Sequence, residues 1–272
     1  MGEIAEVSSH SLAQLISLSG RTAVVTGGGR GLGKAIAARL AEAGANVVIG
    51  DILGDLAEEA AADLDGKYAS TVVGTAMDVT DEKSVEAAAK LAQDRFGRLD
   101  IWVNNAGIFP SVAVTEMSAD QWDKVFAVNT RGVFLGSRVA ARHMIEGGNG
   151  GVIVNIASTA AFNGVAPGLA AYVGSKHAVR GMTRQNALEL APHGIRVLGV
   201  APTFCVTEGN LLAMEEHPLP DPEEVNIQAM LGSKLGRVGV PDDIARVVLF
   251  CASDLAIFMT GSTLLADAGE MI

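Results

Sequence analysis

The sequence predicts an α/β fold in which one parallel sheet is covered by helices on both faces. Short apolar runs alternate with longer, helix-like segments along the whole chain. These runs are continuously apolar, which is typical of strands buried on both faces, as parallel strands are. With 49% hydrophobic and 4% aromatic residues, the chain of 272 residues has ample aliphatic side chains for one large core.

Seven apolar runs are expected to form strands, and six helix-like segments to connect or flank them. The expected strands are 22–25, 45–51, 71–77, 99–103, 151–156, 195–200 and 262–265. The expected helices are 34–42, 55–64, 81–96, 118–144, 171–191 and 241–251. We expect residues 1–19 to be an N-terminal extension with at most one helical turn. Residues 20–272 are expected to form a single domain, because no break in composition and no internal repeat marks a second one.

Polar residues stand where several of the expected strands end. Asp51, Asp78, Asn104 and Ser158 each follow or close an apolar run. In an open parallel sheet, ligands bind outside the carboxyl ends of the strands. Because these four residues share that location, the sequence predicts a ligand site along this edge of the sheet.

A glycine-rich turn, residues 26–33, lies between the first strand and the first helix. Glycines let a backbone approach a pyrophosphate, and the N-terminus of the following helix offers N–H groups to an anion. The GxGxxG spacing cannot be fitted here, and a P-loop fails because Ala35 lacks the hydroxyl that would hold Mg²⁺. The spacing that fits is Gly27-x-x-x-Gly31-x-Gly33, with a purely structural glycine turn as the alternative.

The second strand ends in Asp51, 18 residues after Gly33. A carboxylate at this position can accept hydrogen bonds from the adenosine ribose hydroxyls and would repel a 2′-phosphate. Asp51 therefore favours NAD over NADP as the cofactor. Arg30, within the turn, could pair with a phosphate and is the argument for NADP.

A tyrosine and a lysine, Tyr172 and Lys176, are spaced to lie on one face of a helix. A nearby cation favours the phenolate, so such a tyrosine could exchange a proton with an alcohol. Ser158, 14 residues before Tyr172, could hydrogen-bond a carbonyl or alkoxide oxygen. Asn129 stands in an apolar segment and must find partners there, with Lys176 or an intervening water as a candidate.

Together these residues resemble the short-chain dehydrogenase/reductase family, over about Leu18 to Gly269. The turn from Thr26 to Gly33 is similar to the cofactor turn of that family. Asn104-Asn105-Ala106-Gly107 is similar to its NNAG signature, and Asp78-Val79 to its adenine-contacting pair. The residues matching its catalytic tetrad are Asn129, Ser158, Tyr172 and Lys176.

The resemblance implies a single Rossmann-type domain with a seven-stranded parallel sheet in the order 3-2-1-4-5-6-7. It also implies hydride exchange between a nicotinamide and a carbon that bears a hydroxyl or keto group. By this resemblance Tyr172 is the general acid/base, and Lys176 lowers its pKa and holds the nicotinamide ribose. Ser158 would orient the substrate oxygen, and Asn129 would support a water-mediated proton relay.

The resemblance also supplies a set of expected NAD contacts. They are Gly27, Arg30, Gly31, Leu32, Gly33, Asp51, Ile52, Asp78, Val79, Asn105, Ala106, Gly107, Tyr172, Lys176, Pro202, Thr203 and Thr207. The chain departs from the family after the sixth strand, where Leu198 and Thr203 replace an asparagine and a glycine. The backbone at Thr203 is therefore expected to differ. The C-terminal Ala266-Asp267-Ala268-Gly269 is a looser version of Val-Asp-Gly-Gly.

Apolar residues are expected to line the substrate side, with residues 203–238 as a lid. The expected substrate contacts are Phe109, Ser158, Ala160, Tyr172, Phe204, Leu211 and Leu212. They indicate an apolar secondary alcohol or its ketone, of small to medium size and including cyclic ones. Packing of the lid on a neighbouring subunit is the alternative for Leu211 and Leu212. A carrier-bound 3-oxoacyl reductase and a non-catalytic dinucleotide sensor are the alternative functions.

The net charge of −11, with no basic cluster, argues against nucleic acid or an anionic membrane as a partner. The two cysteines, Cys205 and Cys251, form neither a disulfide framework nor a metal-binding spacing, so no metal is expected. We see no apolar run long enough to span a membrane and no signal peptide, so we expect a cytoplasmic protein. The family resemblance favours a homo-oligomer, most simply a tetramer.

Overall fold

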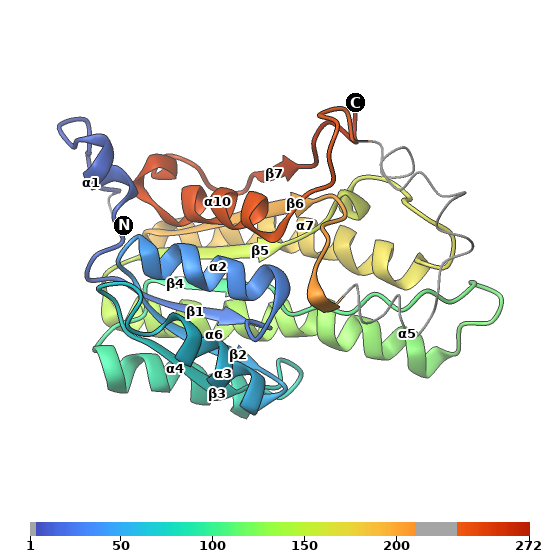
Figure 1. Ribbon diagram of the computed structural model, residues 1–272, viewed down its shortest axis with the longest axis horizontal. Helices are drawn as coiled ribbons and strands as arrows, with labels where there is room; N and C mark the ends of the chain where they lie inside the picture. The colour runs from blue at the N-terminus through green and yellow to red at the C-terminus, as the bar shows by residue number, and fades with distance from the viewer. Residues whose placement is uncertain (1–3, 210–232) are drawn as a thin grey trace.

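The structure is a computed structural model that describes residues 4–209 and 233–272. Within these residues, seven parallel strands form one sheet in the order β3-β2-β1-β4-β5-β6-β7, as expected (Figure 1). The strands are β1 Thr22–Thr26, β2 Asn46–Asp51, β3 Val72–Ala76, β4 Ile101–Asn104, β5 Gly151–Ile156, β6 Ile195–Pro202 and β7 Thr263–Ala266. Every predicted strand is present, with its bounds within two residues of those expected.

The helices also follow the predicted order. They are α1 Leu12–Ile16, α2 Gly31–Glu42, α3 Gly54–Leu64, α4 Glu82–Phe96, α5 Ala119–Phe126, α6 Gly132–Gly147, α7 Ala170–Leu190 and α10 Pro241–Ala252. The single helix expected over 118–144 is in fact two α-helices joined by a five-residue π-helical turn, Ala127–Arg131. Asp81 caps α4 through its side chain, which accepts a hydrogen bond from the N–H of Lys83.

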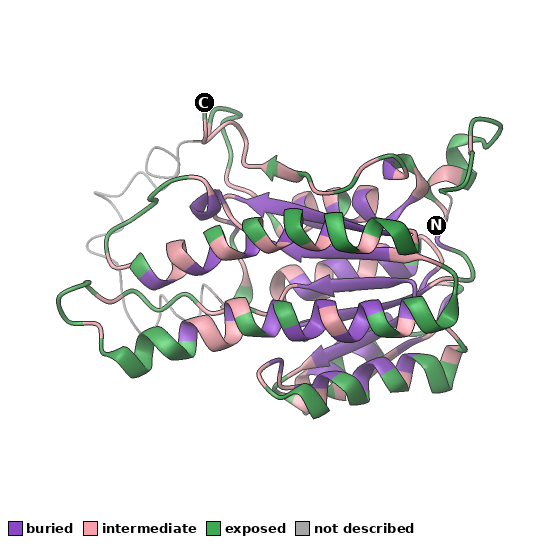
Figure 2. Cartoon of the chain, turned by 180° about the vertical axis from the view of Figure 1, so that it is seen from behind, coloured by how far each residue is buried: buried purple, intermediate pink, exposed green. Residues whose placement is uncertain are grey.

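Two cores lie on opposite faces of the sheet. On one face, Ile36 and Leu40 of α2 pack with apolar residues of α3 and α10 against alternate strand residues such as Val25. On the other, α4, α6 and α7 pack against the intervening strand residues, including Val24 and Trp102. Burial is concentrated in the sheet and on the helix faces turned towards it (Figure 2). This arrangement explains why apolar residues predominate on both faces of the strands.

The N-terminal extension includes one short helix, α1, with a capping box between Ser11 and Gln14. Two of its large apolar residues are exposed, Leu12 at 77% and Ile16 at 40%. None of the helices in the described residues is both long and apolar enough to cross a membrane. The predicted lid contacts Leu211 and Leu212 lie outside the residues that the structure describes.

The order of the strands in the sheet changes direction at β1. From β1 the chain adds β2 and β3 on one side, and β4 and the later strands lie on the other side. Connections therefore leave β1 and β4 in opposite directions, which opens a crevice at the carboxyl ends of these strands. The turn after β1 and the Asn105–Gly107 segment after β4 both lie at this crevice. The fold thus brings the two most specific sequence motifs together.

Candidate active site

The glycine turn after β1 is sterically confined. Gly27 has a φ of +61° and Gly31 a φ of +57°, a region that favours glycine. A Cβ on Gly27 would lie 2.8 Å from the Cα of Ala106, and a Cβ on Gly33 would collide with the carbonyl oxygen of Gly27. Glycine is therefore required at the positions that the spacing of the motif singled out.

The N-terminus of α2 has the properties of an anion site. Arg30 is the N-cap residue, but its side chain makes no capping hydrogen bond, and the first turn holds no acidic residue. The first N–H groups of α2 are thus left for a ligand, and the helix dipole favours a negative charge there. This cradle fits the pyrophosphate of a dinucleotide cofactor.

Thr26 and Asn105 hold the turn in place. The Thr26 hydroxyl accepts hydrogen bonds from the N–H groups of Asn105 and Ala106, both at 3.0 Å. The Asn105 side-chain amide donates to the carbonyl oxygens of Thr26 and Gly27, both at 2.9 Å. Asn105 was predicted as a cofactor contact, yet its amide N–H groups are used within the protein. Thr26, which was not among the predicted site residues, shapes the turn through its hydroxyl.

Asp51 lies beside the glycine turn. Its carboxylate accepts one hydrogen bond from the N–H of Gly29, at 3.0 Å, and one from the N–H of Leu53, at 3.1 Å. Each carboxylate oxygen can accept a further hydrogen bond, for example from a ribose hydroxyl. Ile52, the next residue, is 70% exposed and therefore free to contact a ligand.

Asp78 and Val79, the pair expected at the adenine, follow β3. The Asp78 carboxylate accepts hydrogen bonds from the N–H and hydroxyl of Thr80, at 2.8 and 2.7 Å. Val79 is 8% exposed and lies against Gly132 of α6, where a Cβ would come within 2.9 Å of the valine side chain. These contacts fix the loop between β3 and α4 near the crevice.

The catalytic candidates come from β5 and α7. Ser158 stands two residues beyond β5, where its hydroxyl accepts a hydrogen bond from the N–H of Ala160 at 3.1 Å. Tyr172 and Lys176 lie on α7, with the lysine Nζ 5.6 Å from the centre of the tyrosine ring. Lys176 is buried and donates to the carbonyl oxygen of Ile156, at 2.8 Å. Ser158 and Tyr172 are both partly accessible, as groups that meet a substrate must be.

Burial dominates the acid–base properties of this pair. It raises the pKa of Tyr172, while a hydrogen bond with the Ser158 hydroxyl lowers it. Burial also lowers the pKa of Lys176 to about 8. The group that lowers the pKa of Tyr172 here is Ser158, and the role expected of Lys176 in lowering that pKa stays a prediction.

Asn129 occupies the π-helical turn and is completely buried. Its Oδ1 accepts from the N–H of Ile108 and its Nδ2 donates to the carbonyl oxygen of Ile108, both at 2.8 Å. Nδ2 also donates to the hydroxyl of Ser175, at 3.1 Å. The partner suggested from the sequence, Lys176, is thus replaced by Ile108 and Ser175. A π-helical turn is common at functional sites and here places the amide opposite α7.

The predicted substrate contacts fall into two groups. Phe109 is 48% exposed and meets Tyr172 edge to face, with ring centres 5.9 Å apart. Phe204 is partly exposed after β6. Ala160, by contrast, is fully buried, so its side chain does not face an open cleft and only its N–H serves the site. Phe109 is therefore the best-placed apolar group beside the acid–base pair.

The segment after β6 approaches the glycine turn. Pro202 still belongs to β6 and pairs with Ala266, so the strand continues beyond its predicted end. Thr203 does not adopt the positive φ that a glycine there would allow. Thr207 lies against Gly31, since a Cβ on that glycine would be 3.3 Å from the Thr207 Cβ. Thr207 therefore stands beside the N-terminus of α2.

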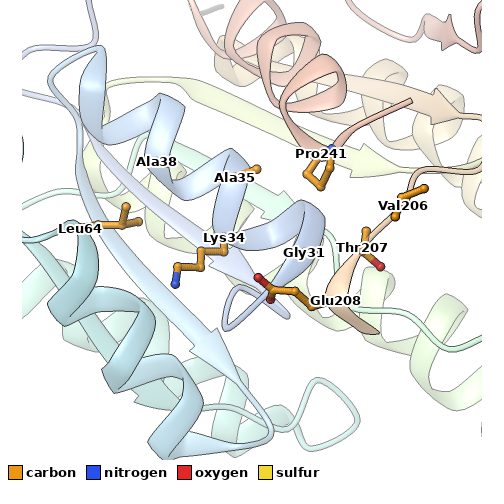
Figure 3. A pocket seen from close by; sticks show the side chains of 9 residues that line it. All are labelled: Gly31, Lys34, Ala35, Ala38, Leu64, Val206, Thr207, Glu208 and Pro241. Atoms are coloured by element: carbon orange, nitrogen blue, oxygen red, sulfur yellow. The ribbon is translucent and has the colours of Figure 1, made fainter. Parts of the chain in front are cut away.

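A cavity of about 420 Å³ opens on the outer side of this corner (Figure 3). Its wall runs from Gly31 and Ala35 on α2 to Thr207 and Pro241, and none of the catalytic candidates lines it. We therefore assign it to the surroundings of the cofactor turn and not to the substrate. Across residues 4–209 and 233–272, no three His, Cys, Asp or Glu side chains gather into a potential metal site.

Comparison with known proteins agrees with this geometry. A family profile described as "Enoyl-(Acyl carrier protein) reductase" matches residues 27–270. The chain is 37% identical to the short chain dehydrogenase/reductase astE of Aspergillus oryzae, over 94% of this chain and 97% of that protein. It is 36% identical to the (+)-borneol dehydrogenase 2 of Salvia officinalis, over 93% and 90%.

It is also 36% identical to a 3-oxoacyl-[acyl-carrier-protein] reductase FabG of Thermotoga maritima, over 94% and 99% of the two chains. A crystal structure of a short-chain type dehydrogenase/reductase from Mycobacterium marinum superimposes with a TM-score of 0.86. It covers 96% of this chain and 99% of its own, at 32% identity. The chain therefore belongs to the short-chain dehydrogenase/reductase family, whose members are oxidoreductases that use nicotinamide dinucleotides.

Proposed function

We propose that the protein is an NAD-dependent oxidoreductase that interconverts an apolar secondary alcohol and its ketone. The observation that carries the proposal is the arrangement of Ser158, Tyr172 and Lys176 at one sheet edge. A partly accessible hydroxyl, a phenol and a buried amine meet there, beside an uncapped helix N-terminus. The nicotinamide, when bound, would take up or give up the hydride.

The residues of the chain then have separate tasks. Tyr172, as the phenolate, accepts the proton of the substrate hydroxyl, and as the phenol it returns that proton in the reverse direction. Ser158 hydrogen-bonds the substrate oxygen and orients it towards Tyr172. Lys176 adds positive charge below the ring and, held by the carbonyl of Ile156, is in place to bind a ribose hydroxyl. Asn129 holds the π-helical turn against Ile108 and supports the relay by position.

Asp51 supports NAD as the cofactor. Its two hydrogen bonds to the Gly29 and Leu53 N–H groups fix the carboxylate at the end of β2, where a 2′-phosphate would meet its negative charge. Arg30 makes no ion pair with a carboxylate among the described residues, so it remains the group that could favour NADP. The other predicted cofactor contacts belong to the same proposal. They are Gly27, Gly31, Leu32, Gly33, Ile52, Asp78, Val79, Asn105, Ala106, Gly107, Tyr172, Lys176, Pro202, Thr203 and Thr207.

Phe109 supports an apolar substrate. Its exposed ring stands edge-on to Tyr172, so a hydrocarbon substrate would cover it and exclude water from the proton-transfer site. The name of the Salvia relative, a borneol dehydrogenase, is consistent with a cyclic secondary alcohol. The 3-oxoacyl reductase remains the second candidate because the Thermotoga relative bears that name. The net charge of −11 disfavours it, since an acidic carrier would be repelled. The proposal also includes a cytoplasmic homotetramer.

Steady-state assays with NAD and a panel of alcohols test this proposal. We expect turnover of apolar cyclic and acyclic secondary alcohols, with NAD preferred over NADP. The matched panel contains sugar alcohols and 3-hydroxyacyl thioesters of similar size. Turnover confined to the thioesters with NADP would establish the second candidate, and turnover confined to the sugar alcohols would exclude both. Binding of NADH without turnover of any alcohol would favour a non-catalytic sensor.

A further inference from the structure

Helix α7 presents one stripe of residues to the sheet. Tyr172, Lys176, Val179 and Thr183 recur every three or four residues, so they lie on one face. Val179 and Thr183 are both fully buried. The stripe thus continues from the end of the helix that carries Tyr172 into the core. Its last residue is Thr183, whose hydroxyl has no part in the proposed reaction.

Two polar members of the stripe attach α7 to β5 at different heights. Near the reacting end, the Lys176 ammonium donates to the carbonyl oxygen of Ile156 at 2.8 Å. About two turns further along, the Thr183 hydroxyl accepts from Nδ2 of Asn155 at 3.0 Å and donates to the carbonyl oxygen of Val179 at 2.9 Å. Two attachment points along one axis prevent the helix from sliding on the strand.

The attachment at Thr183 continues through the sheet. Oδ1 of Asn155 accepts from Nδ2 of Asn104 at 2.8 Å, and the same Nδ2 donates to the hydroxyl of Ser137 on α6 at 3.1 Å. Oδ1 of Asn104 accepts from the indole N–H of Trp102, at 2.8 Å. These five residues are at most 3% exposed. A continuous hydrogen-bonded chain therefore links α7, β5, β4 and α6 beneath the site.

Such a chain controls position better than apolar packing does. Aliphatic contacts lose little when a helix slides by a fraction of an ångström, whereas a buried hydrogen bond weakens steeply when its geometry changes. Leaving one of these buried groups unpaired is unfavourable, because the group has given up water without gaining a partner. Ser158 stands two residues beyond β5 and Tyr172 is on α7. The register of α7 on β5 therefore sets the distance between these two hydroxyls.

We propose that Thr183 and Asn155 are positioning residues, which fix the register of α7 on β5 and so hold Tyr172 within reach of Ser158. The inference rests on the proposed function, in which Tyr172 transfers the proton. Neither residue touches the reacting atoms, and Asn104 anchors their chain from the neighbouring strand.

Thr183→Val and Thr183→Ser test the inference. Valine keeps the shape and removes the hydroxyl, and serine keeps the hydroxyl. We expect Thr183→Val to lower kcat roughly tenfold to a hundredfold, as a small misplacement of reacting groups does, with the Kd for NADH within about twofold of wild type. Thr183→Ser should retain most of the activity. Thr183→Ala removes the same hydroxyl without a β-branch and serves as a second variant if the valine protein does not fold.

The matched control is Thr22→Val. Thr22 is also a buried threonine. It begins β1, at the end of the strand away from the glycine turn, and its hydroxyl has no hydrogen-bond partner within the described part of the chain. Its replacement should leave kcat unchanged. Equal loss of kcat in Thr183→Val and Thr22→Val, or in Thr183→Val and Thr183→Ser, would overturn the inference.

A titration of Tyr172 gives a readout that needs no substrate. The chain has two tyrosines, so Tyr68→Phe leaves Tyr172 as the sole phenol to titrate by ultraviolet difference absorbance. Because the Ser158 hydrogen bond lowers the pKa of Tyr172, Thr183→Val should raise that pKa in the Tyr68→Phe background. Ser158→Ala should raise it too and calibrates the shift.

An unchanged Tyr172 pKa in Thr183→Val would overturn the positioning role even if activity falls. If the wild-type protein turns over no alcohol while Thr183→Val still shifts the titration, the proposed function fails and the positioning of Tyr172 stands. The two failures are thereby distinguished.

Discussion

At the scale of single residues, the site depends on where three side chains stand relative to bulk water. Tyr172 and Ser158 are partly accessible, whereas Lys176 is buried and held by a backbone carbonyl. Burial raises the pKa of the phenol and lowers that of the amine to about 8. In the proposed function, proton transfer at this site is therefore governed by how much of each group is desolvated.

The raised pKa of Tyr172 predicts opposite pH profiles for the two directions of the reaction. Oxidation needs the phenolate, so its kcat/KM should rise as the pH increases from neutral to alkaline. Reduction needs the phenol and should be fastest at the acidic end of the same range. Initial rates of both directions, measured across pH with enzyme that stays folded throughout, check this. An oxidation rate that falls over the range in which Tyr172 ionises would contradict it.

Asp51 makes a prediction about cofactor choice. Asp51→Asn removes the negative charge and keeps an oxygen that can accept the Gly29 N–H bond. We expect the ratio of kcat/KM for NAD to that for NADP to fall at least tenfold, equivalent to about 1.4 kcal/mol. Asp55→Asn, in the first turn of α3, is the control and should leave the ratio unchanged. An unaltered ratio in Asp51→Asn would show that another group selects the cofactor.

The candidate tetrad could be named from the sequence because Asn129, Ser158, Tyr172 and Lys176 match the motifs of the family that the chain resembles. The partners of Asn129 could not, because Ile108 and Ser175 are distant from it in the chain and meet it only after folding. The same holds for Thr183, whose partner Asn155 lies on β5.

At the scale of secondary-structure elements, the sequence predicted the strands better than the helix over 118–144. Strand positions follow from continuous apolar runs, which the two-sided core requires. The π-helical turn at Ala127–Arg131 lies between two α-helical segments, so the sequence predicts one continuous helix and does not reveal the turn. The end of β6 was also missed. The apolar run predicted a strand that ends at residue 200, whereas β6 continues to Pro202 and the apolar Phe204 lies beyond it.

The turn after β7 yields a prediction about stability. Ala268 has a φ of +51° and is the only described residue other than glycine with a positive φ. Alanine in this conformation costs about 1–2 kcal/mol, whereas the extra freedom of an unfolded glycine costs about 0.5–1 kcal/mol. Ala268→Gly should therefore increase the free energy of unfolding, by roughly 0.5–1 kcal/mol after this compensation.

Denaturant unfolding of Ala268→Gly and of Ala38→Gly checks the prediction. Ala38 lies within α2, where glycine should reduce the free energy of unfolding by about 1 kcal/mol. If both variants lose stability, the positive φ at Ala268 carries no strain.

At the scale of the whole molecule, the sequence predicted one domain and seven strands. The order of the strands was predicted from the family resemblance. The composition and the apolar runs were sufficient to predict the fold class because the sheet is buried on both faces. The sequence could not indicate how the C-terminal half is attached to the sheet. Arg196, a charged residue within the otherwise apolar β6, contributes to that attachment.

Arg196 connects β6 to the end of α10. Its guanidinium donates to the carbonyl oxygens of Cys251, Ala256 and Ser253, at 2.9, 3.1 and 3.3 Å. Burial lowers its pKa to about 10. Arg196→Met should reduce the free energy of unfolding by about 2–3 kcal/mol, because these carbonyl groups would lose a charged donor while buried. Urea unfolding measures this, with the exposed Arg95→Met expected within about 0.5 kcal/mol of wild type. A loss no larger than that of Arg95→Met would contradict the role of Arg196.

The central claim, that Tyr172 is the acid–base group of an NAD-dependent alcohol oxidation, is tested most directly by Tyr172→Phe. The variant removes one oxygen and keeps the ring against Phe109. The measurement compares kcat for a turned-over secondary alcohol with the Kd for NADH in the same protein. We predict that kcat falls at least roughly 10²-fold to 10⁴-fold while the Kd for NADH stays within about twofold. A kcat within tenfold of wild type at unchanged NADH binding would contradict the account.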